Sequence, residues 1–216
     1  FFSLAIDTLI TLQKISVQDA QLPAYDEALL RRELQLFPDW YVQHELGITF
    51  TSQQEYLWQQ ACDILVENAL KQSQVLHRDY MPRNLMLSTP NPGVLDFQDA
   101  VQGPVSYDIT SLFKDAFISW PEERVQSWLQ QYWQKAQAQH IAVPETFDAF
   151  QYDCDLMGAQ RHLKVIGIFA RICHRDGKPR YLADAPRFFN YLQQVIERQS
   201  ALAPLAQLLA SFPVAR

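Results

Sequence analysis

The sequence reads Val75-Leu76-His77-Arg78-Asp79-Tyr80-Met81-Pro82-Arg83-Asn84-Leu85-Met86-Leu87 and, after a short turn, Gly93-Val94-Leu95-Asp96-Phe97-Gln98-Asp99. Both runs contain short apolar stretches, and a polar loop with prolines separates them, which is the pattern of two or three short strands. Each run also carries acidic or amide side chains at a strand end or in the adjoining loop. Buried carboxylates are costly unless a partner or a metal ion compensates them, so we expect this segment to carry the function.

The spacing of the polar residues favours one kind of chemistry. Asp79 and Asn84 are five residues apart with Pro82 between them, which places them on a loop rather than on one helix face. Asn84 and Asp96 flank a turn at residues 90–93 that can fold the two strands antiparallel. They can therefore converge on one cation with oxygen ligands, as Mg²⁺ prefers. Asp79 would face the same cleft and accept a proton from a substrate hydroxyl, which makes this a phosphoryl-transfer arrangement.

The remainder of the chain is expected to be helical. Only 6 of the 216 residues are Gly, which argues against a β-rich or dinucleotide-binding fold. Pro38 is expected to break a helix, with Asp39 capping its continuation. A second His-Arg-Asp at 174–176 has Tyr181 where Asn is needed, and it is expected to be a helix-terminating turn. The expected helices cover residues 1–15, 23–37, 52–71, 107–118, 122–139, 145–173, 185–198 and 201–211. The expected fold is one domain over 1–216, mainly α, with a small β-hairpin region at about 74–98.

Composition excludes several classes of function. Eighteen Lys and Arg against 24 Asp and Glu give a net charge of −6, which disfavours binding to nucleic acid. No apolar run is long enough to span a membrane, and no basic region with a cleavage site marks a leader. Cys62, Cys154 and Cys173 are odd in number and far apart, unlike a disulfide framework or a zinc site. A cytoplasmic protein is expected.

The order His-Arg-Asp, four residues, Asn, and then Asp-Phe matches the catalytic and metal-binding loops of protein-kinase-like phosphotransferases. The segment from His77 to Asp108, with Leu-Asp-Phe-Gln-Asp-Ala and the later Ser-Tyr-Asp, resembles the aminoglycoside phosphotransferase and choline kinase branch. Those small-molecule kinases often have Gly where this chain has Arg78. From about Pro23 to Leu182, the flanking sequence resembles the bacterial anomeric kinases of N-acetylmuramate and N-acetylglucosamine, which serve cell-wall recycling.

The resemblance implies a fold, two cofactors and a set of roles. The fold would be the large C-terminal lobe of a protein-kinase-like enzyme, with ATP and Mg²⁺ as cofactors. Asp79 would be the catalytic residue, and Asn84 and Asp96 would hold the metal ion and, through it, the nucleotide. His77 would brace the metal loop. Asp108 would cap the following helix and tie it to the catalytic loop.

The substrate side is less sharply defined by the sequence. A small-molecule acceptor is expected, and the candidate contacts are Asp79, Arg83, Glu33 and Arg161, although helix surfaces carry such charges without any function. The cluster from Arg161 to Lys164 disfavours a cationic substrate. Four acids could serve one instead: Glu33, Asp115, Asp153 and Asp155.

Three alternatives remain beside an amino-sugar kinase: an aminoglycoside or choline-type kinase, a kinase-like lobe that binds without turnover, and a metal-dependent hydrolase. The hydrolase has little support because no His-rich ligand set is present. Kinases of this class also clamp ATP with a second lobe that carries a Gly-rich loop and a Lys. The sequence has neither feature in that arrangement, so this N-terminal lobe is expected to be absent here and to belong to a longer parent protein.

Overall fold

The computed structural model describes residues 1–71 and 73–212, and within them the chain is mainly helical with two small antiparallel sheets. Residues 72 and 213–216 of the expected domain lie outside this description. The chain divides into two compact units. The first comprises Phe1–Asp26 and Ala69–Gly158, and the second comprises Glu27–Asn68 and the residues from Ala159 onward. None of the described helices combines the length and the apolar character needed to cross a membrane.

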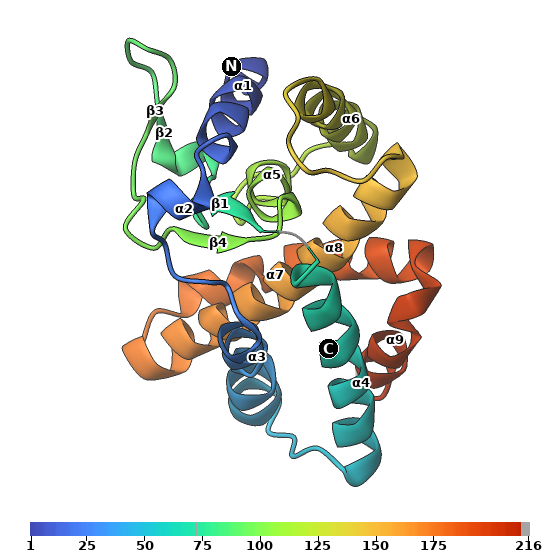
Figure 1. Ribbon diagram of the computed structural model, residues 1–216. Helices are drawn as coiled ribbons and strands as arrows, with labels where there is room; N and C mark the ends of the chain where they lie inside the picture. Colours follow the sequence, from blue (N-terminus) through green and yellow to red (C-terminus); the bar gives the residue numbers. More distant parts are fainter. Residues whose placement is uncertain (72, 213–216) are drawn as a thin grey trace. The chain divides into compact units, whose positions relative to one another are not determined.

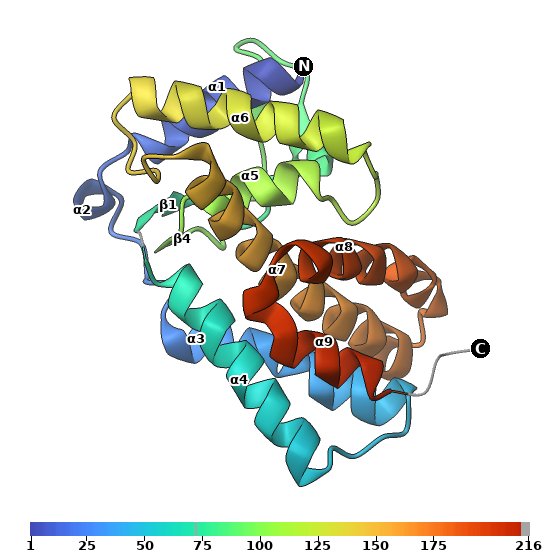
Figure 2. The same cartoon turned by 90° about the vertical axis from the view of Figure 1, so that its right-hand side faces the viewer.

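The first unit contains all the strands that the described residues form (Figure 1). Its elements are α1 (Phe2–Gln13), α2 (Val17–Ala20), β1 (Gln74–Leu76), η2 (Pro82–Asn84), β2 (Leu85–Met86), β3 (Gly93–Val94), β4 (Val101–Gly103), α5 (Ser106–Phe113), α6 (Glu122–Ala138) and the first part of α7 (Phe147–Asp176). The helix α5 is buried along its whole length. Figure 2 shows α6 running alongside α1, and the two helices are in contact. The core of this unit therefore forms around α5.

Helix α1 shows why these residues pack as they do. Ala5, Ile6, Leu9 and Ile10 fall on one face at helical spacing, and each is at most 4% exposed. Tyr80, from the loop after β1, joins the same core and donates a hydrogen bond from its hydroxyl to the Ala5 carbonyl oxygen at 2.7 Å. The loop that carries the candidate catalytic residue is thereby fastened to the core.

Two short ladders hold the chemistry-bearing segment. Strands β1 and β4 pair antiparallel with Leu76 opposite Val101 and Gln74 opposite Gly103. A Cβ at Gly103 would lie 2.8 Å from the Leu76 side chain and 2.9 Å from that of Tyr25, so this position requires Gly. Strands β2 and β3 pair antiparallel with Leu85 opposite Val94, which confirms the expected hairpin.

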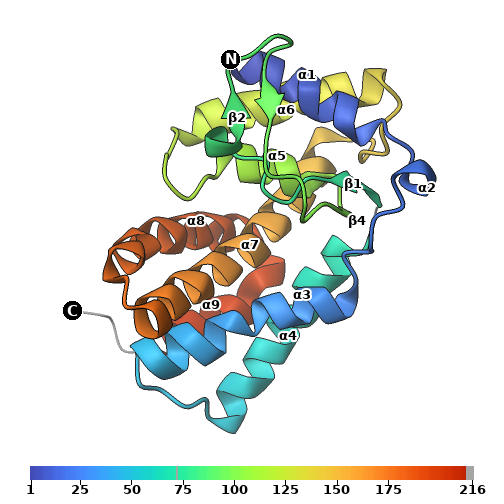
Figure 3. The same cartoon turned by 90° about the vertical axis from the view of Figure 1, so that its left-hand side faces the viewer.

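The second unit is wholly helical within its described residues. It contains α3 (Glu27–Leu34), the π-helix η1 (Phe37–Glu45), all but the last residue of α4 (Ser52–Ala69), the later part of α7, η3 (Pro179–Asp184), α8 (Ala185–Arg198), η4 (Ser200–Leu202) and α9 (Ala203–Ala210). Helices α8 and α9 are in contact (Figure 3). Gly167 of α7 lies so close to the backbone of Leu36 that no Cβ would fit. This close approach fixes how α7 packs within the unit.

Several expectations about the elements were wrong. Strand β4 lies beyond the 74–98 segment, and the helix expected from Pro23 begins at Glu27. A helix break does occur near Pro38, but α3 already ends at Leu34, and Pro38 sits in the first turn of η1, where its missing N–H costs no hydrogen bond. Asp39 does not cap a helix. Its carboxylate instead accepts a hydrogen bond from the side-chain amide of Gln35 at 2.7 Å.

The helix ends differ as well. Helix α5 stops at Phe113 rather than at 118, and α7 continues to Asp176. The second His-Arg-Asp therefore forms the last helical residues. Gly177, with φ +66°, follows directly and ends the helix in the left-handed conformation that favours Gly.

Candidate active site

The loop after β1 folds into a tight turn that fixes Asp79. The Met81 N–H donates to the Asp79 carbonyl oxygen, and the Asn84 N–H donates to the Met81 carbonyl oxygen, both at 2.9 Å. The side-chain amide nitrogen of Asn84 also donates to the Asp79 carbonyl, at 2.9 Å. Because the two ends of an amide point in different directions, this bond directs Oδ1 of Asn84 away from Asp79 and leaves it as an acceptor. One residue thus holds the loop closed and presents an oxygen ligand.

Asp108 anchors the start of this loop. It lies in the first turn of α5 and is fully buried. Its Oδ2 accepts the backbone N–H of His77 at 2.7 Å, and its Oδ1 accepts that of Arg78 at 3.0 Å. Val105, not Asp108, occupies the N-cap position of α5. The Asp108 carboxylate therefore ties the helix to the loop through two charge-assisted hydrogen bonds.

Arg78 has a left-handed backbone, with φ +70°. An L-residue pays roughly 1–2 kcal/mol for this conformation, and Gly adopts it freely. This explains why Gly suits the position in the kinases that the sequence resembles. In this chain the Arg78 side chain makes contacts of its own, since Nη1 donates to the Asp99 carbonyl oxygen at 3.3 Å and the guanidinium lies 5.6 Å from the Tyr25 ring centroid.

His77 is buried and contacts both the loop after β1 and the backbone of Leu95. Its Nδ1 accepts the backbone N–H of Asp79 at 3.3 Å, and its ring meets that of Tyr80 edge-on. Burial lowers the pKa of the imidazole, and the backbone of Leu95 and the charges of Asp79 and Asp96 only partly offset this. A neutral ring in this position braces the loop.

The hairpin pairs the backbone of Asn84 with that of Leu95, the residue before Asp96. The Leu95 N–H donates to the Asn84 carbonyl oxygen at 2.9 Å, which extends the Leu85–Val94 ladder by one step and makes Asp96 the next residue along. Asp96 has φ +69°, so the regular alternation of strand faces does not continue through it. Its side chain is exposed, and its Oδ1 accepts a hydrogen bond from the Gln98 amide at 2.8 Å.

This donor set suits Mg²⁺ rather than a softer metal. It offers one amide oxygen and one carboxylate on an accessible hairpin, and Mg²⁺ commonly completes its shell with waters and substrate phosphates. Across residues 1–71 and 73–212, no three His, Cys, Asp or Glu side chains gather closely enough to hold a metal ion by themselves. A cation at Asn84 and Asp96 would therefore depend on oxygens from outside the chain.

The candidate substrate contacts divide between the two units. Arg83 belongs to the same loop as Asp79, and its guanidinium carbon lies 3.1 Å from the centroid of the Phe117 ring. Glu33 and Arg161 are buried within the second unit. There the two carboxylate oxygens of Glu33 contact Lys164 Nζ at 2.8 Å and the Gln160 amide at 3.2 Å. The structure thus assigns Asp79, Arg83, Asn84 and Asp96 to the first unit, and Glu33 and Arg161 to the second.

The acids considered for a cationic substrate already have partners. Asp153 pairs with Lys71 at 3.0 Å, and Asp155 lies 3.8 Å from the buried Lys114. Asp115 accepts the backbone N–H of Phe117 at 3.3 Å. No sequence pattern pointed to Phe117, which was expected inside a helix but lies in the loop after α5.

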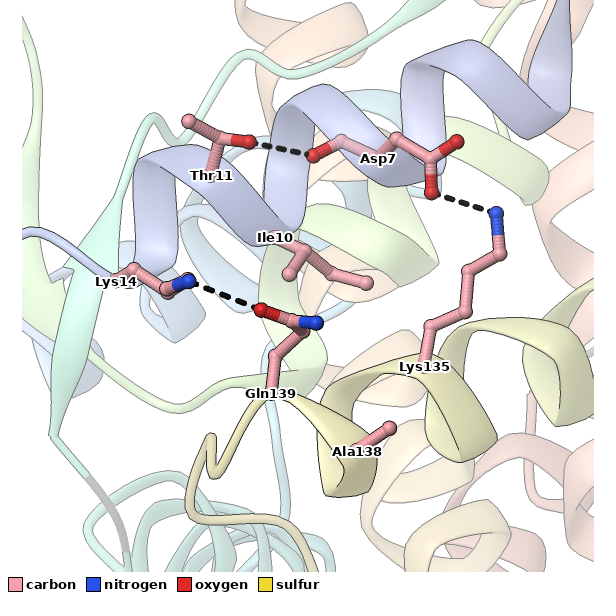
Figure 4. Close-up of a pocket in the computed structure, with 7 residues that line it drawn as sticks. All are labelled: Asp7, Ile10, Thr11, Lys14, Lys135, Ala138 and Gln139. Atoms are coloured by element: carbon pink, nitrogen blue, oxygen red, sulfur yellow. Dashed lines mark hydrogen bonds and ion pairs between the residues drawn. The ribbon is translucent and has the colours of Figure 1, made fainter.

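A hollow of about 300 Å³ lies between α1 and α6, away from these residues (Figure 4). Its charged side chains bind across it, with Lys14 donating to the Gln139 side chain at 2.9 Å and Lys135 pairing with Asp7 at 2.5 Å. None of the motif residues lines it. We therefore assign the chemistry to the loop and the hairpin, and not to this hollow.

The sequence of the chain is similar to those of known phosphotransferases. The pattern that defines the phosphotransferase enzyme family matches residues 1–150. The chain is 64% identical over 97% of its length to an N-acetylmuramate/N-acetylglucosamine kinase of Pseudomonas putida, and 61% identical over 98% to one of Pseudomonas aeruginosa. A kinase of the same name from Neisseria meningitidis is 52% identical over 95%. The chain spans 62%, 63% and 61% of the lengths of these three relatives. On the family match, the chain belongs to the phosphotransferase enzyme family.

Proposed function

We propose that this chain forms the acceptor-activating and metal-binding part of an ATP-dependent kinase that phosphorylates the anomeric hydroxyl of an N-acetylated amino sugar. The observation that carries the proposal is that the Asn84 amide nitrogen holds the Asp79 carbonyl, which leaves its Oδ1 available as a ligand, while the Asn84 backbone pairs with Leu95, the residue before Asp96. The names of the relatives supply the substrate class. Cytoplasmic recycling of cell-wall sugars is the corresponding biological role.

In this proposal Asp79 orients the anomeric hydroxyl and takes its proton. That hydroxyl is more acidic than an ordinary alcohol, so the carboxylate need act only late in the transfer. Asn84 keeps the Asp79 backbone in place, and Asn84 and Asp96 hold Mg²⁺. When bound, ATP would supply the γ-phosphoryl group and leave as ADP, and Mg²⁺ would supply the positive charge that offsets the negative charge of the transferred group. Asp108 and His77 act through the loop backbone and are positioning residues.

A neutral or anionic acceptor is favoured over a polycationic one. Glu33, Asp153 and Asp155 each lie beside a lysine, which neutralises the charge that an aminoglycoside or choline would need. Arg83 adds a positive charge next to the loop. An aminoglycoside or choline-type kinase is therefore the second candidate.

We further propose that the nucleotide clamp is supplied from outside these 216 residues. The six glycines, at 47, 93, 103, 158, 167 and 177, are too widely separated to form a Gly-rich phosphate loop. The greater length of the relatives is consistent with an additional lobe. A kinase-like lobe that binds without turnover is the alternative for the isolated chain.

The test is a transfer assay with radiolabelled ATP on the complete kinase, with amino sugars, aminoglycosides and choline as acceptors. We expect label in N-acetylmuramate and N-acetylglucosamine phosphates that are labile to mild acid, as anomeric phosphates are. Label in kanamycin-like acceptors at lower substrate concentration would favour the second candidate. Transfer to none of the acceptors would contradict the kinase proposal.

A further inference from the structure

Arg83 differs from the arginines that form ion pairs in the structure. Arg31 pairs with Asp63, Arg175 with Asp176, and Arg187 with Asp184. The Arg83 side chain is exposed, and within residues 1–71 and 73–212 its guanidinium contacts no carboxylate and donates no hydrogen bond to the protein. Its one described side-chain contact is with the face of Phe117.

The stacking on Phe117 holds the guanidinium in a defined orientation. A cation over an aromatic face gains roughly 0.5–1 kcal/mol at an exposed site, enough to offset part of the entropy of a long side chain. Because the ring covers only the face, the N–H donors at the edge stay accessible. A planar guanidinium presented in this way matches a carboxylate through two parallel hydrogen bonds.

The position of Arg83 sets where such an anion would lie. Arg83 occupies η2 between Pro82, which fixes the backbone φ, and Asn84, which holds the Asp79 carbonyl. Base and guanidinium therefore belong to one closed turn. In N-acetylmuramate the carboxylate belongs to a lactyl group that is ether-linked through the oxygen on C3, and C3 is separated from the anomeric carbon by C2 alone. One turn can thus reach both groups of the same sugar.

We propose that Arg83 binds the lactyl carboxylate of N-acetylmuramate and so determines the preference of the enzyme for the anionic sugar over the neutral one. Phe117 is the positioning residue that orients the guanidinium. The proposal rests on the amino-sugar kinase function proposed above, and it goes further by assigning the substrate discrimination to one side chain.

The principal test is Arg83→Gln in the complete kinase. We expect kcat/KM for N-acetylmuramate to fall about 10- to 100-fold, the range of one charge-assisted hydrogen-bonded pair, mainly through KM. N-acetylglucosamine, which lacks the carboxylate, should lose much less. Arg124→Gln is the matched control, because Arg124 also lies over an aromatic ring, 5.8 Å from the Trp128 centroid. It should leave the ratio of the two sugars unchanged.

Two further measurements separate recognition from a folding defect. The methyl amide of N-acetylmuramate has no charge, so wild type should have about the same low kcat/KM for it as Arg83→Gln has for N-acetylmuramate. With the methyl amide as substrate, Arg83→Gln should lower kcat/KM only a little further. Phe117→Leu keeps the guanidinium but removes its platform, and it should give an intermediate loss for N-acetylmuramate alone.

Three outcomes would overturn the proposal. An equal loss of kcat for both sugars would show that Arg83 serves the transferred phosphoryl group, while the kinase function itself would stand. If wild type has the same kcat/KM for the methyl amide as for N-acetylmuramate, the enzyme does not recognise the carboxylate. If wild type phosphorylates neither sugar, the proposed function fails and this assignment fails with it.

Discussion

The carboxylate of Asp108 accepts the backbone N–H of Arg78 at 3.0 Å, and Arg78 is one of the residues with a left-handed backbone. The second carboxylate oxygen accepts the N–H of His77 at 2.7 Å. A buried anion thus holds the loop at the residue where the chain is strained, immediately before Asp79. Strain of this kind persists only where the surroundings fix it.

Asp108→Asn should destabilise the fold. The amide can accept at only one end and places an NH₂ group against a backbone donor. With each hydrogen bond to a charged group contributing roughly 1.5–3 kcal/mol, we expect a loss of about 2–4 kcal/mol in the free energy of unfolding. Urea unfolding followed by circular dichroism measures it. Asp99→Asn, at an exposed side chain, is the control, and equal midpoints for the two variants would contradict the anchoring role.

Asp79→Asn in the complete kinase should lower kcat about 10²- to 10⁴-fold, the usual contribution of a general base. Nucleotide affinity should change little, because Asp79 is assigned to the hydroxyl and not to ATP. Steady-state kinetics and nucleotide titration give the two numbers. Turnover like that of wild type would show that another residue acts as the base.

Asp96→Asn should act on the metal. Removal of the one carboxylate in the pair should raise the Mg²⁺ concentration for half-maximal activity roughly 10-fold or more, since Mg²⁺ prefers charged oxygen ligands. Titration of activity with Mg²⁺ at saturating sugar tests this. An unchanged Mg²⁺ requirement together with reduced kcat would remove Asp96 from the metal site.

Gly167→Ala tests the close packing of the second unit. Ala gains about 1 kcal/mol of helix propensity over Gly, but its Cβ would run into the backbone of Leu36, and overpacking costs typically 1–3 kcal/mol or more. Backbone cannot move aside as a flexible side chain can, so we expect net destabilisation. Gly177→Ala, with open space but φ +66°, is the control and should lose about 1 kcal/mol from backbone strain alone. Thermal midpoints that fall in the reverse order would contradict the packing.

The cysteines should react unequally. Burial raises the pKa of the Cys62 thiol to about 12, and burial also raises the pKa of Cys154 well above its usual value. Both therefore remain protonated at pH 8, where alkylation requires the thiolate. Cys173 is only partly buried. Mass spectrometry after brief iodoacetamide treatment should find Cys173 modified first, and all three should react in urea. Early modification of Cys62 would show that its environment opens.

The sequence predicted the parts of the fold that depend on local pattern. Helix α8 has the expected bounds, and the Leu85–Val94 pairing follows from the turn between two short apolar runs. Strand β4 could not be predicted, because its three residues pair with β1 across more than twenty intervening residues. The Gly103 requirement likewise arises from side chains distant in sequence. The break near Pro38 was predicted as well, because proline is accepted in the first turn of a helix but not in its interior; only the end of α3 at Leu34 came earlier than expected.

For the candidate site, spacing alone placed Asn84 and Asp96 on one hairpin. The contacts that hold Asp79 were not foreseen, since the Asn84 amide bond to its carbonyl depends on the path of the loop. Phe117 also gave no signal, because the end of α5 at Phe113 is set by tertiary packing rather than by periodicity. Sequence thus predicted the candidate groups, and the structure supplied the contacts that hold their backbone in place.

The Leu76–Val101 pair has one more consequence. Because Leu76 and Val101 are paired, the two ends of the intervening segment, residues 77–100, lie next to each other at the β1–β4 ladder. A segment whose ends meet can be exchanged as a cassette between relatives without rerouting the rest of the backbone, provided that Asp108, Tyr25 and Phe117, which contact it from outside, are retained. Variation in acceptor preference could then be transplanted, and inherited, as one contiguous piece.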